Sequence, residues 1–587
     1  MSTSLLTTFL SDITASLKNK NGQRIAELIH LDVERLQPDR QRPYVELNAE
    51  LNSQYPKDSD EDLSERCRSA VPVDEFNTFT APFSECLVKY FRYLRDFTSS
   101  DNLTRALEIR SLTSQCVIAL GDSRYGIVMI PIVLSFSRTL AVIAANLDRN
   151  PGLVRQRISL ESSLSEDSNV TFVEATANVL REAFIKCLSP STPRLSRPTP
   201  SDKRIGIYLT ANSTLALLNR SGKLRNATQI FNSIQAQSPP LSYYPAAQRI
   251  TYLYYLGRYH FANNHFLRAA IVLESAYRQC HPSFTSHRRL ILIHLITANL
   301  TLGRLPSLQL LTRPECATFG HIFLQLISIL KSGDIGAFHF FLDLPPPPTP
   351  PAPHTSFLIK HRIILPLRNR LEPLVYRSLI RSTFRMTAYI PPPEGPEAKK
   401  IPFLYLSSVR HAAIFSFSRI PSHYYATIMD YVHPDFANLT PTLSHTGFNL
   451  SSGTYSSSPA TDLERTAAAA AAAAAGGTEL IGLFPPRRRH KSENPDQEDQ
   501  SVFPTIWTIE NTFLSLIHQG LLAGFVAHGG AAEGRQRWAI AGAKARGGPL
   551  PAGFPVVYTA IIDRAGKLAD DVDRIPGWLS NVRPVGA

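Results

Sequence analysis

Three arginines stand at helical spacing in a basic part of the chain. Arg377, Arg381 and Arg385 occupy positions i, i+4 and i+8, so a helix would carry their guanidinium groups on one face. We expect all three to be exposed. Such a row can contact phosphates spaced along a nucleic-acid backbone. The alternative is a solvated helix face without a ligand.

The surrounding sequence is rich in cations. Residues 360–419 hold eleven Lys or Arg against three Glu, which accounts for +8 of the net charge of +13. This concentration suits phosphate neutralisation or an acidic protein partner. Solvated surface is again the alternative for each cation. Further candidate phosphate contacts are Lys399, Lys400 and Arg410, together with Arg535, Arg537, Lys544 and Arg546 on a predicted wing.

A separate basic run, PPRRRHK at 485–491, follows two prolines in a segment of low apolar content. An accessible run of this kind is what a nuclear import receptor binds. Basic runs are also common without that role. The run predicts a nuclear protein, with the cytoplasm as a further location, and its candidate import residues are Arg487, Arg488, Arg489 and Lys491.

Enzymatic motifs are missing from the sequence. There is no GxxxxGK[ST], GxGxxG or HExxH motif, and GDSRYG at 121–126 does not have nucleophile-elbow spacing. The 17 histidines are dispersed, and none of the six cysteines forms a CxxC pair. We therefore expect no catalytic residue, metal, cofactor or small-molecule substrate. The sequence leaves open a Ser-His-Asp triad assembled only by the fold.

The first twenty residues lack the basic n-region of a secretory signal and carry Asp12 within their apolar stretch, which predicts an intracellular protein with reduced cysteines. Residues 125–147 are apolar enough to raise the question of a membrane span. Pro131 and Arg138 interrupt this segment, and Arg138 would lie near the bilayer centre. We predict a buried helix pair here and no membrane partner.

The elements that would position these cations begin at residue 203. Four stretches share one pattern, in which a helix ends at a residue that tolerates positive φ and an apolar residue follows two positions later. The predicted turn residues are Gly222, Asn264, Gly303 and Gly333. The apolar residues are Leu224, Phe266, Leu305 and Ile335, and the predicted helix-pair contacts are Ala227, Ala269, Leu308 and Phe338.

These turns lie 42, 39 and 30 residues apart, an irregular spacing around the 34-residue tetratricopeptide period. One stretch also matches the packing positions of that repeat, at Leu253, Leu256, Gly257, Ala269, Leu273 and Ala276. Because a single hairpin of this kind cannot bury its apolar face alone, hairpins must stack. The pattern predicts a degenerate helical-hairpin solenoid, and a generic helix pair is the alternative for each hairpin.

The end of the chain changes character. Residues 432–503 turn to Ser, Thr, Gly and a run of nine alanines, which predicts a disordered insertion. A helix through Ile509, Phe513, Leu516 and Ile517 then ends near Gly520. Two short strand candidates follow, around 523–527 and in RWAIAGAK at 537–544. A helix followed by a two-stranded ribbon is the ending of a winged helix-turn-helix.

The predicted fold class is all-α, a tetratricopeptide-like helical-hairpin solenoid followed by a winged-helix module with a small β wing. The 587 residues exceed what one core usually supports, so we expect several segments. They are an amino-terminal helix and polar appendage (1–75), a helical region with a Ser/Pro linker (76–202), the solenoid (203–400), the winged-helix part interrupted at 432–503 (401–560) and a tail (561–587).

Three stretches resemble the PCI-domain family, whose members include a signalosome subunit-twelve-like protein and a subunit of the nuclear transcription-and-mRNA-export complex. The block YPAAQRITYLYYLGRYHFANNHFLRAAIVLESAYRQCHPSFTSHRRLILIHLITANLTLGRLPS, at 244–307, resembles the family's signature. LPLRNRLEPLVYRSLIRSTF (365–384) resembles its next helix, and IENTFLSLIHQGLLAGFVAH (509–528) its winged-helix segment. Lys544 and Phe554-Pro555 fit the pattern that closes the wing. The insertion at 432–503 and the long Gly/Ala-rich wing differ from the family.

The resemblance implies a solenoid capped by a winged helix that assembles side by side with other PCI subunits. In the export complex it further implies a platform that binds RNA or DNA, largely without sequence preference, helped by a small acidic subunit. The alternative is a purely protein-binding subunit of a signalosome, proteasome-lid or initiation-factor type assembly. Only the basic cluster at 360–419 separates the two, because a protein-only scaffold needs it only for an acidic partner.

Overall fold

The computed structural model describes residues 4–31, 37–56, 59–71, 73–96, 102–147, 172–188, 197–199, 202–344, 351–392, 394–418, 504–528 and 536–568. The chain divides into two compact units between Ile291 and Leu292, within the segment predicted as solenoid. Each unit is described by itself.

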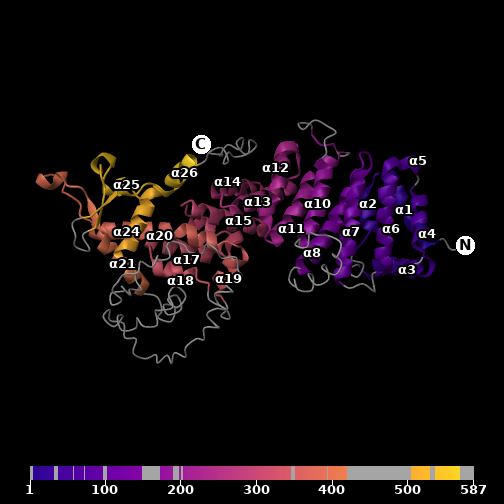
Figure 1. The fold of residues 1–587 in the computed structure, drawn as a ribbon, viewed down its shortest axis with the longest axis horizontal. Helices are drawn as coiled ribbons and strands as arrows, with labels where there is room; N and C mark the ends of the chain where they lie inside the picture. The colour runs from indigo at the N-terminus through magenta and orange to yellow at the C-terminus, as the bar shows by residue number, and fades with distance from the viewer. Residues whose placement is uncertain are drawn as a thin grey trace, which may run out of the picture. The chain divides into compact units, whose positions relative to one another are not determined.

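The first unit is built of helices that lie side by side roughly in sequence order (Figure 1). They are α1 (Leu5–Lys18), α2 (Gly22–Leu28), α3 (Pro38–Gln54), α4 (Asp60–Ala70), α5 (Val73–Phe76), α6 (Thr80–Asp96), α7 (Asn102–Leu120), α8 (Met129–Leu147), α10 (Phe172–Leu188), α11 (Ile207–Arg220), α12 (Thr228–Gln237), α13 (Ala246–Ala262) and α14 (Phe266–Gln279). The six cysteines of the chain are free thiols, and all are buried.

The apolar segment 125–147 forms the short 3-10 turn η4 (Gly126–Val128) and one long helix, α8, rather than the predicted helix pair. Pro131 lies in the first turn, where a helix needs no backbone N–H donor, so this proline does not break it. Among the described residues, Gly126–Ala144 is the stretch long and apolar enough to cross a membrane, and 56% of it is buried inside the protein. Phe136 and Leu140 are fully buried, as in a core helix.

The four predicted turns are confirmed. The φ angles are 80° at Gly222, 62° at Asn264, 76° at Gly303 and 74° at Gly333, all in the left-handed region. The pair α13 and α14 has the tetratricopeptide packing, because a Cβ at Gly257 would lie 2.5 Å from Cγ of Leu273. Helix α15 (Thr285–Thr301) begins the next pair.

The third predicted hairpin forms its turn at Gly303, but the prediction for the helix after that turn is wrong. Leu305 and Leu308 are exposed, and the helix that follows, α16 (Leu308–Leu311), has only four residues. Two prolines explain this result, because proline disfavours helical backbone at the residue before it. Pro306 delays the start of the helix to Leu308, and Pro314 ends it, since Arg313 before it is extended. The turn at Gly303 packs instead against Val557, the first residue of α26 (Val557–Leu568), and the Arg304 guanidinium lies 4.3 Å from the Tyr558 ring centroid.

The second unit continues with helices and a small sheet. Its elements after α16 are α17 (Gly320–Ser332), α18 (Ile335–Phe341), α19 (Pro353–Lys360), α20 (Ile364–Thr387), β1 (Phe403–Tyr405), α21 (Leu406–Ser418), α24 (Ile506–His518), β2 (Phe525–Ala527), β3 (Arg537–Ala539), α25 (Pro549–Gly553) and α26. The two predicted strands are confirmed as β2 and β3. The strand β1 was not predicted, and α26 crosses the predicted boundary at 560. The insertion at 432–503 lies outside the described residues.

The long helix α20 is held by the turn between α17 and α18. A Cβ at Gly333 would overlap the backbone nitrogen of Leu379, so the turn contacts the helix backbone directly. Leu367, Leu371 and Val375 are fully buried along the same helix. Thr383 and Phe384 continue this buried face into the last turns of α20.

Candidate nucleic-acid interface

The elements from α20 onward follow the order of a winged helix. Helix α20 leads to β1, α21, α24 and then the strands β2 and β3. The sheet is antiparallel with the strand order β1-β3-β2, so the last strand lies in the middle. In this order α24 holds the position of the recognition helix, and the predicted winged-helix ending is confirmed.

Trp538 is the centre of this module. Its side chain is fully buried, and its ring centroids lie 5.7 Å from Phe384, 5.7 Å from Phe513 and 5.5 Å from Phe554. These rings come from α20, α24 and the segment after α25. One residue of the middle strand therefore joins the sheet to both long helices.

Arg377 does not share an exposed face with Arg381 and Arg385, and that prediction is wrong. The side chain is buried, with Nε donating to the Leu521 carbonyl at 3.0 Å and a terminal nitrogen donating to the Pro555 carbonyl at 2.6 Å. Burial, and next the charge of Arg381, lower the pKa of the guanidinium to about 10. Arg377 therefore holds the segments after α24 and after α25 to α20, and its guanidinium is not presented at the surface.

The cations beyond Arg377 are differently placed. Arg381 and Arg385 lie on the last two turns of α20 and are exposed, and within the described residues neither forms an ion pair. Lys399 and Lys400 are exposed in the loop before β1, where Lys400 pairs with Glu397. The predicted contact Arg410 is half-buried, and its Nε donates to the Pro504 carbonyl at 3.1 Å, which restricts its reach.

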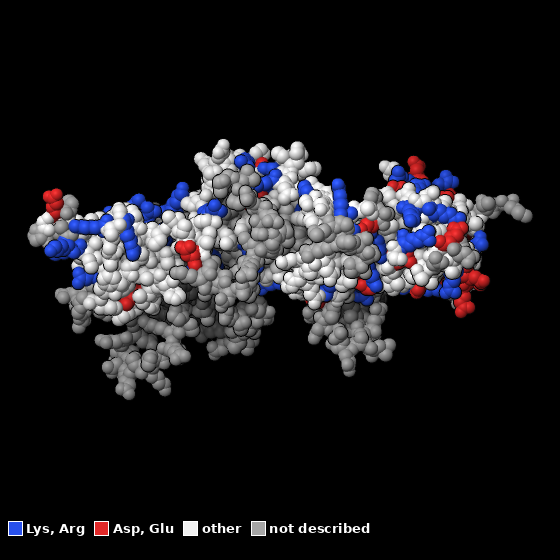
Figure 2. Space-filling model, turned by 90° about the horizontal axis from the view of Figure 1, so that it is seen from above, with Lys and Arg blue, Asp and Glu red and all other residues white. Residues whose placement is uncertain are grey.

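On the wing, Arg537 lies on β3 and is half-buried, with its guanidinium 5.2 Å from the Phe403 ring centroid. Lys544 and Arg546 are exposed on the 3-10 turn η12 (Lys544–Arg546). In Figure 2, Lys and Arg side chains gather at the left end of the view, over the winged-helix elements. Arg535 and the basic run Arg487, Arg488, Arg489 and Lys491 lie outside the described residues.

Helix α24 holds the recognition position but offers no cation to a phosphate. Its sequence, IWTIENTFLSLIH, contains neither Lys nor Arg. The exposed side chains are Trp507, Asn511, Leu514 and His518. The charge of this module therefore lies on the end of α20, the loop before β1 and the turn after β3, which favours contact with a phosphate backbone over groove reading by α24.

The outer face of the sheet was not predicted from the sequence. Phe403 and Tyr405 lie on β1 with their side chains away from Trp538, and Phe525 lies on β2 on the same side. Tyr389 pairs with Phe403 through the backbone and stacks on its ring at 5.1 Å between centroids. The alternation Phe-Leu-Tyr after Pro402 is the signal that could have revealed a strand with one aromatic face.

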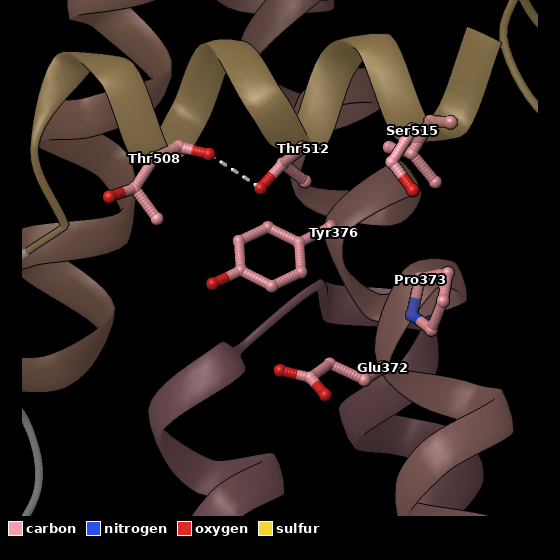
Figure 3. Close-up of a pocket in the computed structure, with 7 residues that line it drawn as sticks. Glu372, Pro373, Tyr376, Thr508, Thr512 and Ser515 are labelled. Carbon is pink, nitrogen blue, oxygen red and sulfur yellow. Dashed lines mark hydrogen bonds between the residues drawn. The ribbon is translucent and has the colours of Figure 1, made fainter. Parts of the chain in front are cut away.

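A small pocket lies between α20 and α24 (Figure 3). Glu372, Pro373 and Tyr376 face Thr508, Thr512, Ser515 and Leu516 across it. The Thr512 hydroxyl donates to the Thr508 carbonyl at 2.8 Å, as a helical threonine commonly does. Its lining supplies one carboxyl group and several hydroxyls but no histidine or cysteine. Among the residues that the structure describes, no three His, Cys, Asp or Glu gather as a metal site requires.

Glu372 also approaches a histidine on its other side. Its Oε1 lies 3.5 Å from Nε2 of His339, and Glu372 is buried while His339 is half-buried. Burial raises the pKa of Glu372 to about 7 and lowers that of His339 to about 4, and the Arg368 charge acts second on each, lowering both values. Burial thus disfavours the charged form of both groups.

Changing Glu372 to Gln should stabilise the protein at pH 8. The folded-state pKa of Glu372 lies above its ordinary value of 4.5, so its favourable contribution is complete below pH 4.5 and is lost as the pH rises through 7. The variant should therefore gain up to about 2–3 kcal/mol at pH 8. His339 acts in the opposite sense, its contribution being lost as the pH falls from 6.5 through 4. Melting temperatures at pH 5, 6.5 and 8 measure both effects.

The matched control is the exposed Glu394 changed to Gln, which should melt like the parent protein at each pH. If the Glu372→Gln and Glu394→Gln variants have the same melting temperature at pH 8, then ionising the buried Glu372 carboxyl does not destabilise the protein.

Comparisons with known proteins find distant relatives of this chain. No family model matches the chain. A PCI domain-containing protein of Schizosaccharomyces pombe is 27% identical over 308 residues, 52% of this chain and 65% of the relative. A CSN12 homolog of Neurospora crassa is 28% identical over 216 residues, 36% of this chain and 44% of the relative. PCI domain-containing protein 2 of Xenopus laevis is 22% identical over 380 residues, 64% of this chain and 81% of the relative.

The matches thus span less than two thirds of the first two relatives and about four fifths of the third. This chain is a distant homologue of the PCI domain-containing proteins and CSN12 homologs.

Proposed function

We propose that this chain is a non-enzymatic scaffold subunit of a nuclear complex that binds RNA or DNA in transcription-coupled mRNA export or processing. The observation that carries the proposal is the placement of Arg381 and Arg385, exposed on the last turns of α20, near the elements of a winged helix. Lys399, Lys400, Lys544 and Arg546 add exposed cations in the same module. These residues contact backbone phosphates and specify no base.

Its protein partners in this proposal are other PCI-family scaffold subunits and a small acidic subunit. The relatives are named for their PCI domain, which supports assembly with subunits of the same kind. The net charge of +13 suits an acidic partner. Import into the nucleus is assigned to Arg487, Arg488, Arg489 and Lys491, and the cytoplasm remains a second location in this proposal.

Changing Arg381 and Arg385 together to Ala should weaken nucleic-acid binding for every sequence. Each lost phosphate contact removes about 0.9 from the log-log salt slope for duplex DNA, or about 0.7 for a single strand, so the slope should flatten by about 1.4–1.8. Because both side chains are exposed, the helical content and melting temperature should stay unchanged. Fluorescence anisotropy between 50 and 200 mM KCl, with two unrelated RNA and two unrelated DNA sequences, measures this slope at about physiological ionic strength and below.

The matched control removes the same two charges from the first unit, where Arg24 and Arg42 are exposed. That double alanine variant should retain the parent slope. If the Arg381/Arg385 variant and the Arg24/Arg42 variant have the same salt slope, the end of α20 is a solvated surface that does not contact phosphate.

A purely protein-binding scaffold of the signalosome, proteasome-lid or initiation-factor type is the second candidate. It is favoured by α24, which lacks cations and exposes the apolar side chains of Trp507 and Leu514. In that case the parent protein itself should show no salt-dependent affinity for RNA or DNA in the same titration.

A further inference from the structure

We propose that the outer face of the three-stranded sheet is a stacking platform for unpaired bases of a single-stranded nucleic acid. The proposal rests on the proposed nucleic-acid function and adds to it the form of nucleic acid that is preferred. It concerns a different surface from the cations of α20, because it is carried by aromatic side chains of β1 and β2.

The strand register places these side chains on one face. Phe403, Ala539 and Phe525 are opposite one another across the sheet, and so are Tyr405, Arg537 and Ala527. Residues two apart on a strand point to the same side of the sheet, so these two rows share one face. The row between them contains the fully buried Leu404 and Trp538, which face the core. The aromatic rows must therefore face outward.

The outward rings are accessible. Tyr405 is 42% exposed and Phe525 is 45% exposed, on the two outer strands of the sheet. The Tyr405 ring meets Phe403 edge to face at 5.3 Å between centroids, and Tyr389 extends the cluster by stacking on Phe403. On the same face, Ala539 of the central strand is buried and Ala527 lies on β2 itself. Both side chains are short, which leaves the rings of Tyr405 and Phe525 standing above the sheet.

A cation lies in the middle of this face. The Arg537 guanidinium on the central strand lies 5.2 Å from the Phe403 centroid, so a planar charged group is held beside the rings. The exposed Lys399 lies in the loop that leads into β1. No acidic residue belongs to the three strands, and the neighbouring Glu397 is already bonded to the Tyr389 hydroxyl and Lys400.

This chemistry fits unpaired bases better than a protein surface. A base offers a flat apolar face to an aromatic ring, while its phosphate carries the charge that Arg537 and Lys399 complement. In a duplex the base faces are already stacked on each other, so they are not available to Tyr405 or Phe525. The face should therefore discriminate single strands from duplexes of the same length.

The test is the double variant Tyr405→Ala and Phe525→Ala, measured with a twelve-nucleotide uridine RNA and with a twelve-base-pair DNA duplex. Loss of two stacking rings should lower the affinity for the RNA about thirtyfold or more, because each stacked base contributes about fivefold or more. Affinity for the duplex and the salt slope of both ligands should be unchanged, since no charge is removed. The matched control, Tyr405→Phe with Phe525→Tyr, retains both rings and should bind like the parent.

A second measurement does not depend on variants. Irradiating the parent protein with the same RNA carrying 5-iodouridine should crosslink to the peptide that contains Tyr405 or Phe525. RNA affinity equal to that of the parent in the alanine variant, with crosslinks elsewhere, would overturn the platform while the salt-dependent binding remained. An equal loss of RNA and duplex affinity would also overturn it.

The alternative to a base platform is that this face contacts a second copy of the chain, and the same variant tests it. One outcome is that the double alanine variant binds RNA like the parent, while the parent self-associates in analytical ultracentrifugation and the variant does not. The face would then contact a second copy of the chain rather than bases. The absence of any salt-dependent binding by the parent protein would instead refute the proposed function itself.

Discussion

Changing Arg377 to Ala should destabilise the second unit by about 3–4 kcal/mol, the cost of a cavity together with two unsatisfied buried acceptors. The guanidinium donates to the Leu521 and Pro555 carbonyls and lies 5.6 Å from the Phe554 ring centroid. Truncation removes both donors and the ring contact at once. Lysine should not restore the stability, because a single ammonium cannot reproduce the fork that reaches two carbonyls.

Chemical denaturation of the intact chain measures this loss through the transition of the second unit. Arg381→Ala is the matched control, one turn further along α20 and exposed, and it should change stability by less than about 0.5 kcal/mol. The opposite outcome is an Arg377→Ala protein that is as stable as the parent but has a flatter salt slope of nucleic-acid binding. It would show that Arg377 contacts phosphate after all.

Changing Trp538 to Ala should cost about 3–5 kcal/mol, the usual range for removing a large aromatic side chain from a core. The ring is fully buried and contacts Phe384, Phe513 and Phe554. Two glycines also approach it, since a Cβ at Gly524 would lie 2.6 Å from the Trp538 Nε1 and a Cβ at Gly553 would lie 3.0 Å from its Cη2. Removing the indole therefore separates the sheet from α20 and α24 together.

The measurement is again denaturation, combined with amide hydrogen exchange of β1 and β2, which should lose protection. Trp507→Ala is the matched control, because that tryptophan is 59% exposed on α24 and its loss should change stability little. A loss below about 1 kcal/mol for Trp538→Ala would mean that the neighbouring rings close the cavity.

The sequence by itself determined the turns, the helices and the two strands of the wing. Gly222, Asn264, Gly303 and Gly333 all adopt positive φ, because the residue type and its immediate neighbours decide backbone conformation at the end of a helix. Local sequence also explains why the prediction of the third hairpin is wrong. Pro306 and Pro314 stand on either side of the expected contact Leu308 and limit the third helix to four residues, although the wider pattern favoured a hairpin.

Only the tertiary structure decided which side chains are available at the surface. Arg377, Arg381 and Arg385 are the same residue type at equal spacing on one helix, yet the first is buried and the other two are exposed. The carbonyls that bind Arg377 belong to residues 144 and 178 positions further along the chain. The outward aromatic face likewise depends on pairing Phe403 and Tyr405 with β3, more than 130 residues away. Burial is set by such long-range contacts, and local periodicity contains no information about them.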